Sequence, residues 1–377
     1  MNRKKTYGLL GAVAALSVAL VGCSGNAGSA QNDSGGADNT GADGSGDPKV
    51  SLQFASWLGP TQPEAKALAW AFEQIEERSG GSISIEEYWE GALLSGTETL
   101  AGTGDGRADL GHMAVLYNPA ELPLSQLAAV PFMSENPDGT REAYTKLYQE
   151  DEAFRAEWAA AGVIPLSFQG TPPSIMGTTK QVQSIDDLKG MSIRAVGFTA
   201  NAVEMIGANA AALTSPEIYE AMQRGLIEGY TTQLLDTIPT QSLHELTGYV
   251  SDPGIGVYSI NTLIVGEAAW ARLSENQQKL MREVIADVPG KHKEFLAPAE
   301  DAACEALKNE GAEVSVWSDA EKRRWKDAVG DELLDLWRTN VSKAGVEPEA
   351  FLDSYLSTLK ASTGKYDSGV ARCVASR

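Results

Sequence analysis

The order of sequence patterns at the start of the folded region constrains the fold more than any other feature. Residues 50–55 alternate apolar and polar side chains as a β-strand does, and residues 63–78 place apolar side chains on one side of a helix. Residues 83–88 alternate again. This strand–helix–strand order is typical of an α/β domain with a largely parallel sheet. The pattern restarts after Ser174, so a chain of 377 residues is expected to contain two α/β domains.

Two later segments are expected to connect these domains. Residues 163–168 have the pattern of a strand that crosses into the second domain, and residues 256–265 have the pattern of a strand that returns. A long helical region is expected from Ser274 to about Lys308. Pro289 is expected to kink this helix, because proline lacks a backbone donor and clashes with the preceding turn.

The N-terminus predicts export from the cytoplasm. Three basic residues at 3–5 precede an apolar run, Leu9–Val21, which is too short to span a membrane and typical of a signal peptide. Gly22 and Cys23 follow, and this ending resembles the bacterial lipobox. The resemblance implies cleavage before Cys23 and a lipid on its thiol. The alternative is an ordinary signal peptide, residues 1–22, followed by an incidental cysteine.

Composition limits the partners. Residues 23–47 lack aromatic and large aliphatic side chains, so we expect a flexible, lipid-anchored spacer. The formal net charge of −21 repels nucleic acid and anionic membrane surfaces. An anionic ligand would therefore need a local positive group, which makes any buried arginine a candidate for binding.

Two cysteines remain beyond the lipobox. In an oxidising compartment, Cys304 and Cys373 are candidates for one disulfide that would attach the C-terminal tail to a late helix. Two buried free thiols are the alternative.

Signatures of enzymes are missing from the sequence. The histidines at 112, 244 and 292 are scattered and lack ligand-spaced partners, so neither a metal site nor a haem site is expected. No nucleophile elbow, phosphate-binding loop or C-x-x-C motif is present. The glycine-rich residues 102–108 follow a helical pattern instead of a strand, which disfavours dinucleotide binding. We therefore expect no catalytic residues and no cofactor.

Four segments carry a resemblance to a known family. They are residues 72–113, the turn AVPF at 129–132, the run SIDDLKGMSIRAVG at 184–197, and the run IGANAAALTSPEIYEAMQRGLIEGY at 206–230. In this order and spacing they resemble the solute-binding proteins of tripartite ATP-independent periplasmic (TRAP) transporters, of the dicarboxylate-binding P-subunit (DctP) type. The match covers about Lys49 to Leu359, and the resemblance to a lipobox implies a lipoprotein form of this family.

The resemblance implies a two-lobed, periplasmic-binding-protein-like α/β fold. Crossing strands would join the lobes, and a long helix would span both. The expected boundaries are 48–172 with 256–298 for the first lobe, and 173–255 with 299–377 for the second. The lobes would close around a solute and deliver it to membrane permease subunits, with uptake driven by an ion gradient.

The resemblance also implies that Arg194 pairs with the carboxylate of an organic acid. A guanidinium can hold a carboxylate through two hydrogen bonds and stays charged when water is excluded. The alternative is a structural salt bridge from Arg194 to Asp186, Asp187 or Glu217.

The sequence departs from better-known members in the residues that would assist this arginine. Residues 169–174 lack the second arginine of some members, and Met113 and Ala114 replace an acid used by sialic-acid-binding members. Thr232 stands where those members have asparagine. A sialic acid or a doubly clamped diacid is therefore disfavoured. A monocarboxylate, an aromatic or apolar acid, or a small keto acid is favoured.

Other ligand-binding candidates come from position, because ligands of open α/β sheets lie beyond the carboxyl ends of strands. Each could instead be a core or loop residue. They are Trp57, Tyr117, Gln169, Thr232, Gln233 and Tyr258.

The predicted protein is an exported, lipid-anchored solute-binding protein that captures an organic acid for a TRAP permease. Three other classes remain open at this point: a binding protein of an ABC importer, a sensory ligand-binding module and an exported hydrolase. The absence of a catalytic constellation disfavours the hydrolase.

Overall fold

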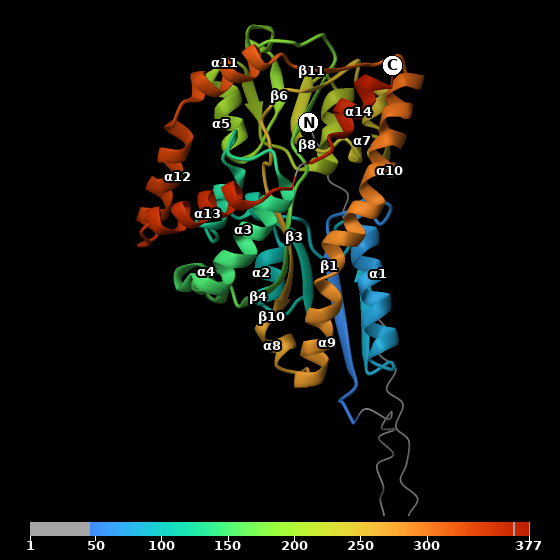
Figure 1. Ribbon diagram of the computed structural model, residues 1–377. Helices are drawn as coiled ribbons and strands as arrows, with labels where there is room; N and C mark the ends of the chain where they lie inside the picture. Colours follow the sequence, from blue (N-terminus) through green and yellow to red (C-terminus); the bar gives the residue numbers. More distant parts are fainter. Residues whose placement is uncertain (1–45, 365, 377) are drawn as a thin grey trace, which may run out of the picture. The chain divides into compact units, whose positions relative to one another are not determined.

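The computed structural model describes residues 46–364 and 366–376, and Figure 1 shows how their helices and strands are arranged. The predicted signal peptide, Cys23 and the spacer up to residue 45 lie outside the described residues. None of the helices in the described part is long and apolar enough to cross a membrane.

The first lobe is built on one of two sheets found among the described residues. It has five strands, in the spatial order β2 (Ile83–Tyr88), β1 (Val50–Ser56), β3 (Leu110–Ala114), β10 (Ile260–Gly266) and β4 (Val163–Gly170). The strands β2, β1 and β3 are parallel, and β10 runs antiparallel to both β3 and β4. The strand–helix–strand pattern at the start of the chain therefore forms the parallel half of this sheet.

The second lobe is built on the other sheet of the described region. Its six strands lie in the order β11 (Glu313–Val316), β9 (Tyr249–Asp252), β5 (Ile175–Thr178), β8 (Gly229–Gln233), β6 (Ser192–Arg194) and β7 (Asn209–Ala211). β6 is parallel to β7 and β8, whereas β5 is antiparallel to β8 and β9. Arg194 is the last residue of β6, so its side chain begins at the carboxyl end of the parallel strands.

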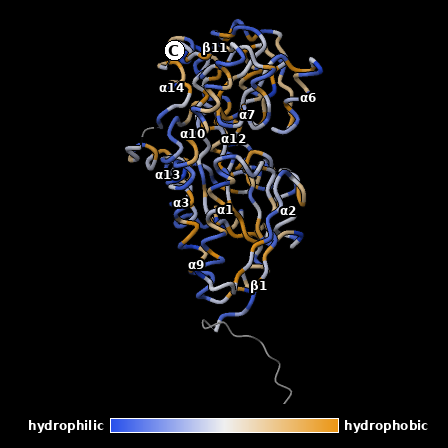
Figure 2. Tube along the Cα trace, turned by 90° about the vertical axis from the view of Figure 1, so that its right-hand side faces the viewer, coloured by the Kyte–Doolittle hydropathy of each residue, from blue (hydrophilic) through white to orange (hydrophobic). Residues whose placement is uncertain are grey.

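Helices cover both sheets and bury their apolar sides against them. Figure 2 shows hydrophobic stretches in α1 and in the strands beside it, where Phe54, Leu68 and Phe72 are buried together. Burial of such side chains is the main stabilising contribution to each lobe. The helices of the first lobe are α1 (Pro63–Arg78), α2 (Thr99–Gly104), α3 (Pro137–Glu150), α4 (Glu152–Ala160), α8 (Glu267–Trp270) and α9 (Glu275–Ile285); those of the second lobe are α5 (Gly197–Met205), α6 (Ile218–Gln223) and α7 (Thr237–Thr240).

A long helix, α10 (Val288–Asn309), contacts both lobes (Figure 1). It packs against α1 of the first lobe and against α7 and α14 (Gly369–Ala375) beside the second sheet. The prediction of one helix kinked at Pro289 is wrong. The helical region divides into α9 and α10 at residues 286–287, and Pro289 lies in the first turn of α10. Proline is tolerated there because the first N–H groups of a helix have no intrahelical acceptor. The proline inside α10 is Pro298.

Two of the segments that cross between the lobes are residues 171–174 and 253–259, and the chain at each of them passes close to the start of α3. A Cβ atom added to Gly170 would lie 2.3 Å from the carbonyl oxygen of Pro137, and one added to Gly256 would lie 2.3 Å from that of Ser134. Gly256 also has a φ of +83°. Glycine is required there both for the close approach and for the left-handed backbone.

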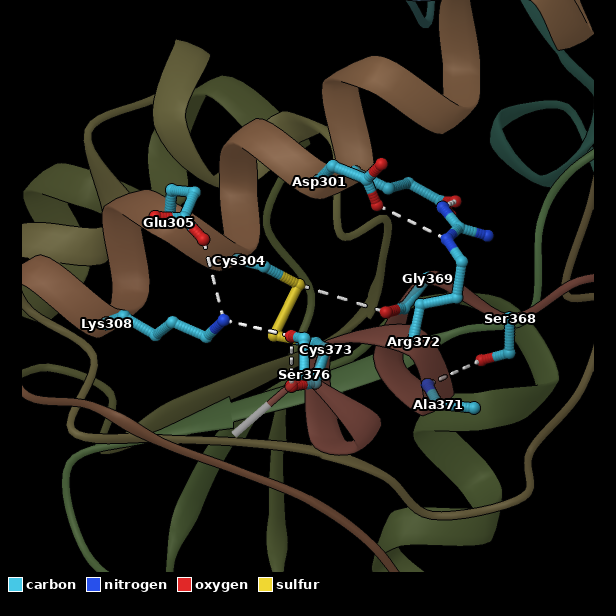
Figure 3. Close-up of a disulfide and its surroundings, with 11 residues drawn as sticks. Asp301, Cys304, Glu305, Lys308, Ser368, Gly369, Ala371, Arg372, Cys373 and Ser376 are labelled. Atoms are coloured by element: carbon cyan, nitrogen blue, oxygen red, sulfur yellow. Dashed lines mark hydrogen bonds and ion pairs between the residues drawn. A yellow bond between two sulfur atoms is a disulfide. The ribbon is translucent and has the colours of Figure 1, made fainter.

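The C-terminal helices return along the molecule after β11. They are α11 (Asp319–Val329), α12 (Glu332–Lys343) and α13 (Glu349–Ala361), of which α11 packs against α5 and α13 packs against α3 of the first lobe. The tail then reaches α10 again through α14. Figure 3 shows Cys304 of α10 and Cys373 of α14 joined in a disulfide. Their Cα atoms are 5.6 Å apart. Next to the disulfide, Nε of Arg372 donates a hydrogen bond to Oδ1 of Asp301.

Candidate functional site

A cavity lies between the lobes, at the carboxyl ends of β1, β3, β6 and β8. It encloses about 570 Å³ of space between atoms, part of it open to solvent. The parallel strands end at this edge, and the antiparallel β10 begins there, since Asn261 pairs with Ala114 at the end of β3. Its lining includes six of the predicted ligand residues: Trp57, Tyr117, Arg194, Thr232, Gln233 and Tyr258.

Arg194 is the most deeply buried charged group of this cavity, with 1% of its surface exposed. Its Nε donates to the carbonyl of Leu213 at 2.9 Å, and its Nη1 donates to the carbonyls of Thr231 and Thr232 at 3.0 and 2.7 Å. These bonds hold the guanidinium plane through Nε and Nη1, and Nη2 takes part in none of them. Burial lowers the pKa of Arg194, while the hydroxyls of Tyr117 and Tyr258 act to raise it.

Thr232 holds the arginine from the end of β8. Its hydroxyl accepts a further bond from Arg194 Nη1 at 3.0 Å, and its own backbone N–H donates to Ser174 Oγ at 2.8 Å. Thr232 has a φ of +51°, a left-handed conformation that is rare for a β-branched residue. Strain of this kind persists where the surrounding structure requires it, and it is concentrated at functional sites.

No carboxylate in the described part of the chain forms a salt bridge with Arg194, and the acids predicted as structural partners are engaged elsewhere. Asp186 pairs with Lys189 and Arg324. Asp187 accepts hydrogen bonds from Ser184. Glu217 accepts hydrogen bonds from Thr214, and its charge acts on Arg194 only at longer range. The predicted alternative of a structural salt bridge is therefore not found.

Aromatic side chains form another wall of the cavity. The rings of Trp57 and Tyr117 meet edge to face, with centroids 6.1 Å apart. Trp57 follows β1, and Tyr117 ends the short 3₁₀ turn Val115–Tyr117 after β3. The indole Nε1 of Trp57 is buried without a hydrogen-bond partner in the described residues. Tyr258 precedes β10, and burial raises the pKa of its hydroxyl well above the ordinary value.

A polar cluster from the first lobe adjoins these aromatic rings. Glu64 Oε1 lies 3.1 Å from Nε2 of His112, and Glu64 Oε2 accepts a bond of 2.6 Å from Asn261. Burial alone would raise the pKa of Glu64, but His112, His292 and Asn261 together lower it below its ordinary value. Glu64 is therefore ionised and internally compensated, which distinguishes it from an acid that awaits a cationic ligand.

Comparison with known families identifies the chain. The family described as bacterial extracellular solute-binding protein, family 7 (DctP), matches residues 54–340. This protein belongs to that family. The predicted TRAP-type solute-binding family and the predicted two-lobed α/β fold are both confirmed.

Individual relatives of this family 7 protein are distant in sequence and similar in fold. A solute-binding protein of Chromohalobacter salexigens is 24% identical over 277 residues, which is 71% of this chain and 77% of that one. A TRAP periplasmic solute-binding protein of Bordetella bronchiseptica, solved with (R)- and (S)-mandelate, is 23% identical with a TM-score of 0.73 over 83% of this chain and 99% of that one. A marine metagenome TRAP protein specific for aromatic acids, solved with 3-hydroxybenzoate, is 21% identical with a TM-score of 0.75 over 84% of this chain and all of that one, 100%.

Two glutamines of the family 7 protein have different surroundings. The amide of Gln233 lines the cavity but is already bonded to Ser215, Thr237 and Gln241. Gln169 does not line the Arg194 cavity. It lies on β4 beside Asn261 and faces a neighbouring cavity next to α10, where its Oε1 is buried without a partner.

Eight polar residues that line the cavity of this family 7 protein were not expected from its sequence: Gln62, Glu64, Ser215, Asp236, Thr237, Ser259, Asn261 and His292. Gln62 and Glu64 flank the first residue of α1. The sequence there does not differ from that of an ordinary solvent-exposed helix start, so it does not predict a place in a cavity. Asp236 lies three residues beyond Gln233, so the strand-end argument could have included it. His292 lies in the middle of α10, and only packing brings it to the cavity.

Metal binding has no support in the described residues of this family 7 protein. No group of three or more His, Cys, Asp or Glu side chains there could hold a metal ion, although His112 and His292 both lie near Glu64.

Proposed function

We propose that this solute-binding protein captures an organic acid between its lobes, with Arg194 as the anchor of the carboxylate, and delivers it to a TRAP permease in the membrane. The observation that carries the proposal is a buried arginine with no acidic partner in the described residues. A buried charge is costly unless it is paired. The carboxylate of a solute would supply the missing partner.

The geometry of the arginine supports this role. Main-chain carbonyls and Thr232 orient the guanidinium through Nε and Nη1, and the Tyr117 side chain also bonds the arginine. Preorganised charge-assisted hydrogen bonds of this kind are roughly twice as strong as neutral ones. The indole N–H of Trp57, which lines the same cavity and lacks a partner in the described chain, would be a second donor for the solute.

Capture would involve separation and closure of the lobes. The cavity takes Trp57 and Tyr117 from the first lobe and Arg194 and Thr232 from the second. Because Arg194 is only 1% exposed, a solute can reach it only when the lobes move apart. We propose that residues 48–172 with 256–298 form one moving part and that residues 173–255 with 299–377 form the other, except that α13 moves with the first part because it packs against α3. The crossing segments 171–174 and 253–259 would be the hinges.

A monocarboxylate fits the cavity better than a diacid. Among the described residues that line it, Arg194 is the one arginine, and lysine does not occur. Aromatic side chains lie beside the arginine, and the similar proteins of known structure bind mandelate and 3-hydroxybenzoate. An acid with an apolar or aromatic body would bury that body against Trp57 and Tyr117.

Isothermal titration calorimetry tests the proposal. The protein and its Arg194→Ala variant are titrated with a panel of aliphatic, aromatic, hydroxy and keto acids. We expect at least one acid to bind the wild type, and the variant to lose roughly 2–5 kcal/mol of binding free energy for that acid. Arg323→Ala is the matched control, because Arg323 is exposed and does not line the cavity, so this variant should bind as the wild type does.

Two results would overturn the proposal. Full affinity of Arg194→Ala for every bound acid would exclude the anchoring role of the arginine. The ligand extracted from the natively expressed protein is added to the panel. If the wild type binds none of the acids and the extracted ligand is not an acid, the solute is not an organic acid.

We further propose that residues 1–22 direct export and that Cys23 carries the lipid that tethers the protein to the membrane. The basic and apolar segments that precede Cys23 support this proposal. Cys23→Ser should leave export intact but release the protein into the soluble extracytoplasmic fraction, as measured by fractionation. Retention of the variant in the membrane would contradict the anchor.

A further inference from the structure

A buried carboxyl group with one unpaired oxygen among the described residues lies in the same cavity as Arg194. Asp236 follows β8 and precedes α7, and 5% of its surface is exposed. Its Oδ1 has no hydrogen-bond partner in the described part of the chain, and it takes part in none of the salt bridges found there. Buried polar atoms are nearly always hydrogen-bonded, so an isolated carboxylate oxygen in a ligand cavity indicates a missing partner.

A structural role does not account for Asp236. It stands at the N-cap position of α7, yet its side chain makes no capping hydrogen bond. The charged groups that act on it most strongly are acids, Glu300 of α10 and Glu64 of α1. Together with burial, which is the larger cause, they raise the pKa of Asp236 to about 7. The remaining titratable neighbours are Tyr258 and Tyr366, which feel its charge. No basic side chain compensates Asp236 in the described region.

A second buried acceptor, in the first lobe, also indicates that a hydrogen-bond donor is missing from the cavity. Gln62 precedes α1, 4% of its surface is exposed, and its Oε1 is also buried without a partner in the described residues. Both Gln62 and Asp236 line the cavity. The cavity therefore presents donors at Arg194 and Trp57, and unsatisfied acceptors at Asp236 and Gln62.

We propose that the solute is a carboxylic acid that also carries a hydrogen-bond-donating substituent, a hydroxyl or an amino group, and that Asp236 is the residue that accepts from it. This inference rests on the proposed function, since it assumes that Arg194 holds the carboxylate. An unsubstituted acid would fill the cavity and leave the Asp236 oxygen dry and unpaired. Sites built to bond a substrate hydroxyl or amine discriminate strongly against analogues that lack the group.

Matched sets of acids test the inference. The probes are propionate, lactate and alanine; phenylacetate, mandelate and phenylglycine; and 3-hydroxyphenylacetate and 3-aminophenylacetate. Calorimetry on the wild-type protein should show at least about a tenfold tighter Kd for a substituted acid than for its unsubstituted parent. Equal or tighter binding of the parents in every set that binds would overturn the inference.

Variants of Asp236 identify the donor and the acceptor. Asp236→Leu, which keeps the branched shape of the side chain but has no acceptor, should reduce the preference to less than about threefold while the parent acid still binds. Asp236→Asn keeps an acceptor oxygen but no negative charge, so it should retain a preference for a hydroxyl and lose one for an ammonium group. Asp353→Asn is the control, because Asp353 is exposed and outside the cavity.

The outcomes separate this inference from the proposed function. Persistence of the full preference in Asp236→Leu, with unfolding curves that show a folded variant, overturns the role of Asp236. Acid binding that depends on Arg194 but shows no preference for substituted acids overturns only this inference. Absence of binding by every acid overturns both.

Discussion

Arg194 Nη1 donates hydrogen bonds to both the main-chain carbonyl and the side-chain hydroxyl of Thr232, over 2.7 Å and 3.0 Å. The strained backbone of Thr232, with a φ of +51°, directs both oxygens toward the same nitrogen. One residue at the end of β8 thereby orients the cation at the end of β6. The site depends on a conformation that threonine adopts only at a cost in free energy.

Thr232→Val should weaken both stability and carboxylate binding. Valine keeps the branched Cβ, and hence the strain, but removes the hydroxyl that accepts from Arg194. We expect a loss of about 1–2 kcal/mol in the free energy of unfolding, measured by urea denaturation, and a several-fold weaker Kd. Thr232→Asn is the matched comparison, because asparagine adopts positive φ more readily and can offer an oxygen. Equal behaviour of Thr232→Val and wild type would contradict the positioning role.

The stability of the unliganded protein should depend on the ionisation of Asp236. Its pKa is raised on folding from 3.8 to about 7, so the folded state binds the proton more tightly than the unfolded state. This contribution is fully present below pH 3.8 and is lost as the pH rises to about 7, at up to about 1.4 kcal/mol per pH unit. The side chain of the Asp236→Asn variant cannot ionise. The unfolding free energy of the variant minus that of the wild type should therefore be larger at pH 8 than at pH 4. Parallel pH profiles of unfolding free energy for the two proteins would exclude this burial cost.

The disulfide should contribute substantially to stability. Cys304 and Cys373 are separated by 69 residues. In the chain-entropy description, closing a loop of that length stabilises the folded state by roughly 4 kcal/mol. The Cys304→Ser, Cys373→Ser double variant should unfold at a lower denaturant concentration, and a reductant should lower the Tm of the wild type but not that of the variant. An unchanged midpoint in the double variant would show that the tail is held by its other contacts.

Gly256→Ala should disrupt the second crossing segment. The added Cβ would approach the carbonyl oxygen of Ser134 to 2.3 Å, at a φ of +83°. Gly345→Ala is a matched control, since Gly345 has a φ of +82° and nothing within 4 Å of its added Cβ. We expect the control to lose about 1–2 kcal/mol from backbone strain alone and Gly256→Ala to lose more. Equal losses in the two denaturation curves would show that the loop at Ser134 moves away at no cost.

Much of the architecture follows from local patterns in the sequence. Alternation in residues 50–55 and 83–88 predicts the first parallel strands, because a half-buried strand repeats every second residue. The run around Arg194 locates the cation at a strand end, and the strand-end rule also selects Trp57 and Thr232, which line the same cavity.

Only the tertiary structure decided which polar groups complete the cavity and which do not. Gln169 satisfies the same positional rule as Thr232, yet it faces a different cavity, because β4 lies at the edge of its sheet beyond β10. Asp236 and Gln62 are more than a hundred residues apart in the chain and come together through the packing of two lobes. Periodicity reports which side of an element is apolar, whereas a shared cavity depends on strand order and lobe contacts between remote segments. The sequence by itself determined the α/β lobes and the arginine, and tertiary packing decided that this arginine shares a cavity with a buried carboxyl group, one oxygen of which has no partner in the described residues.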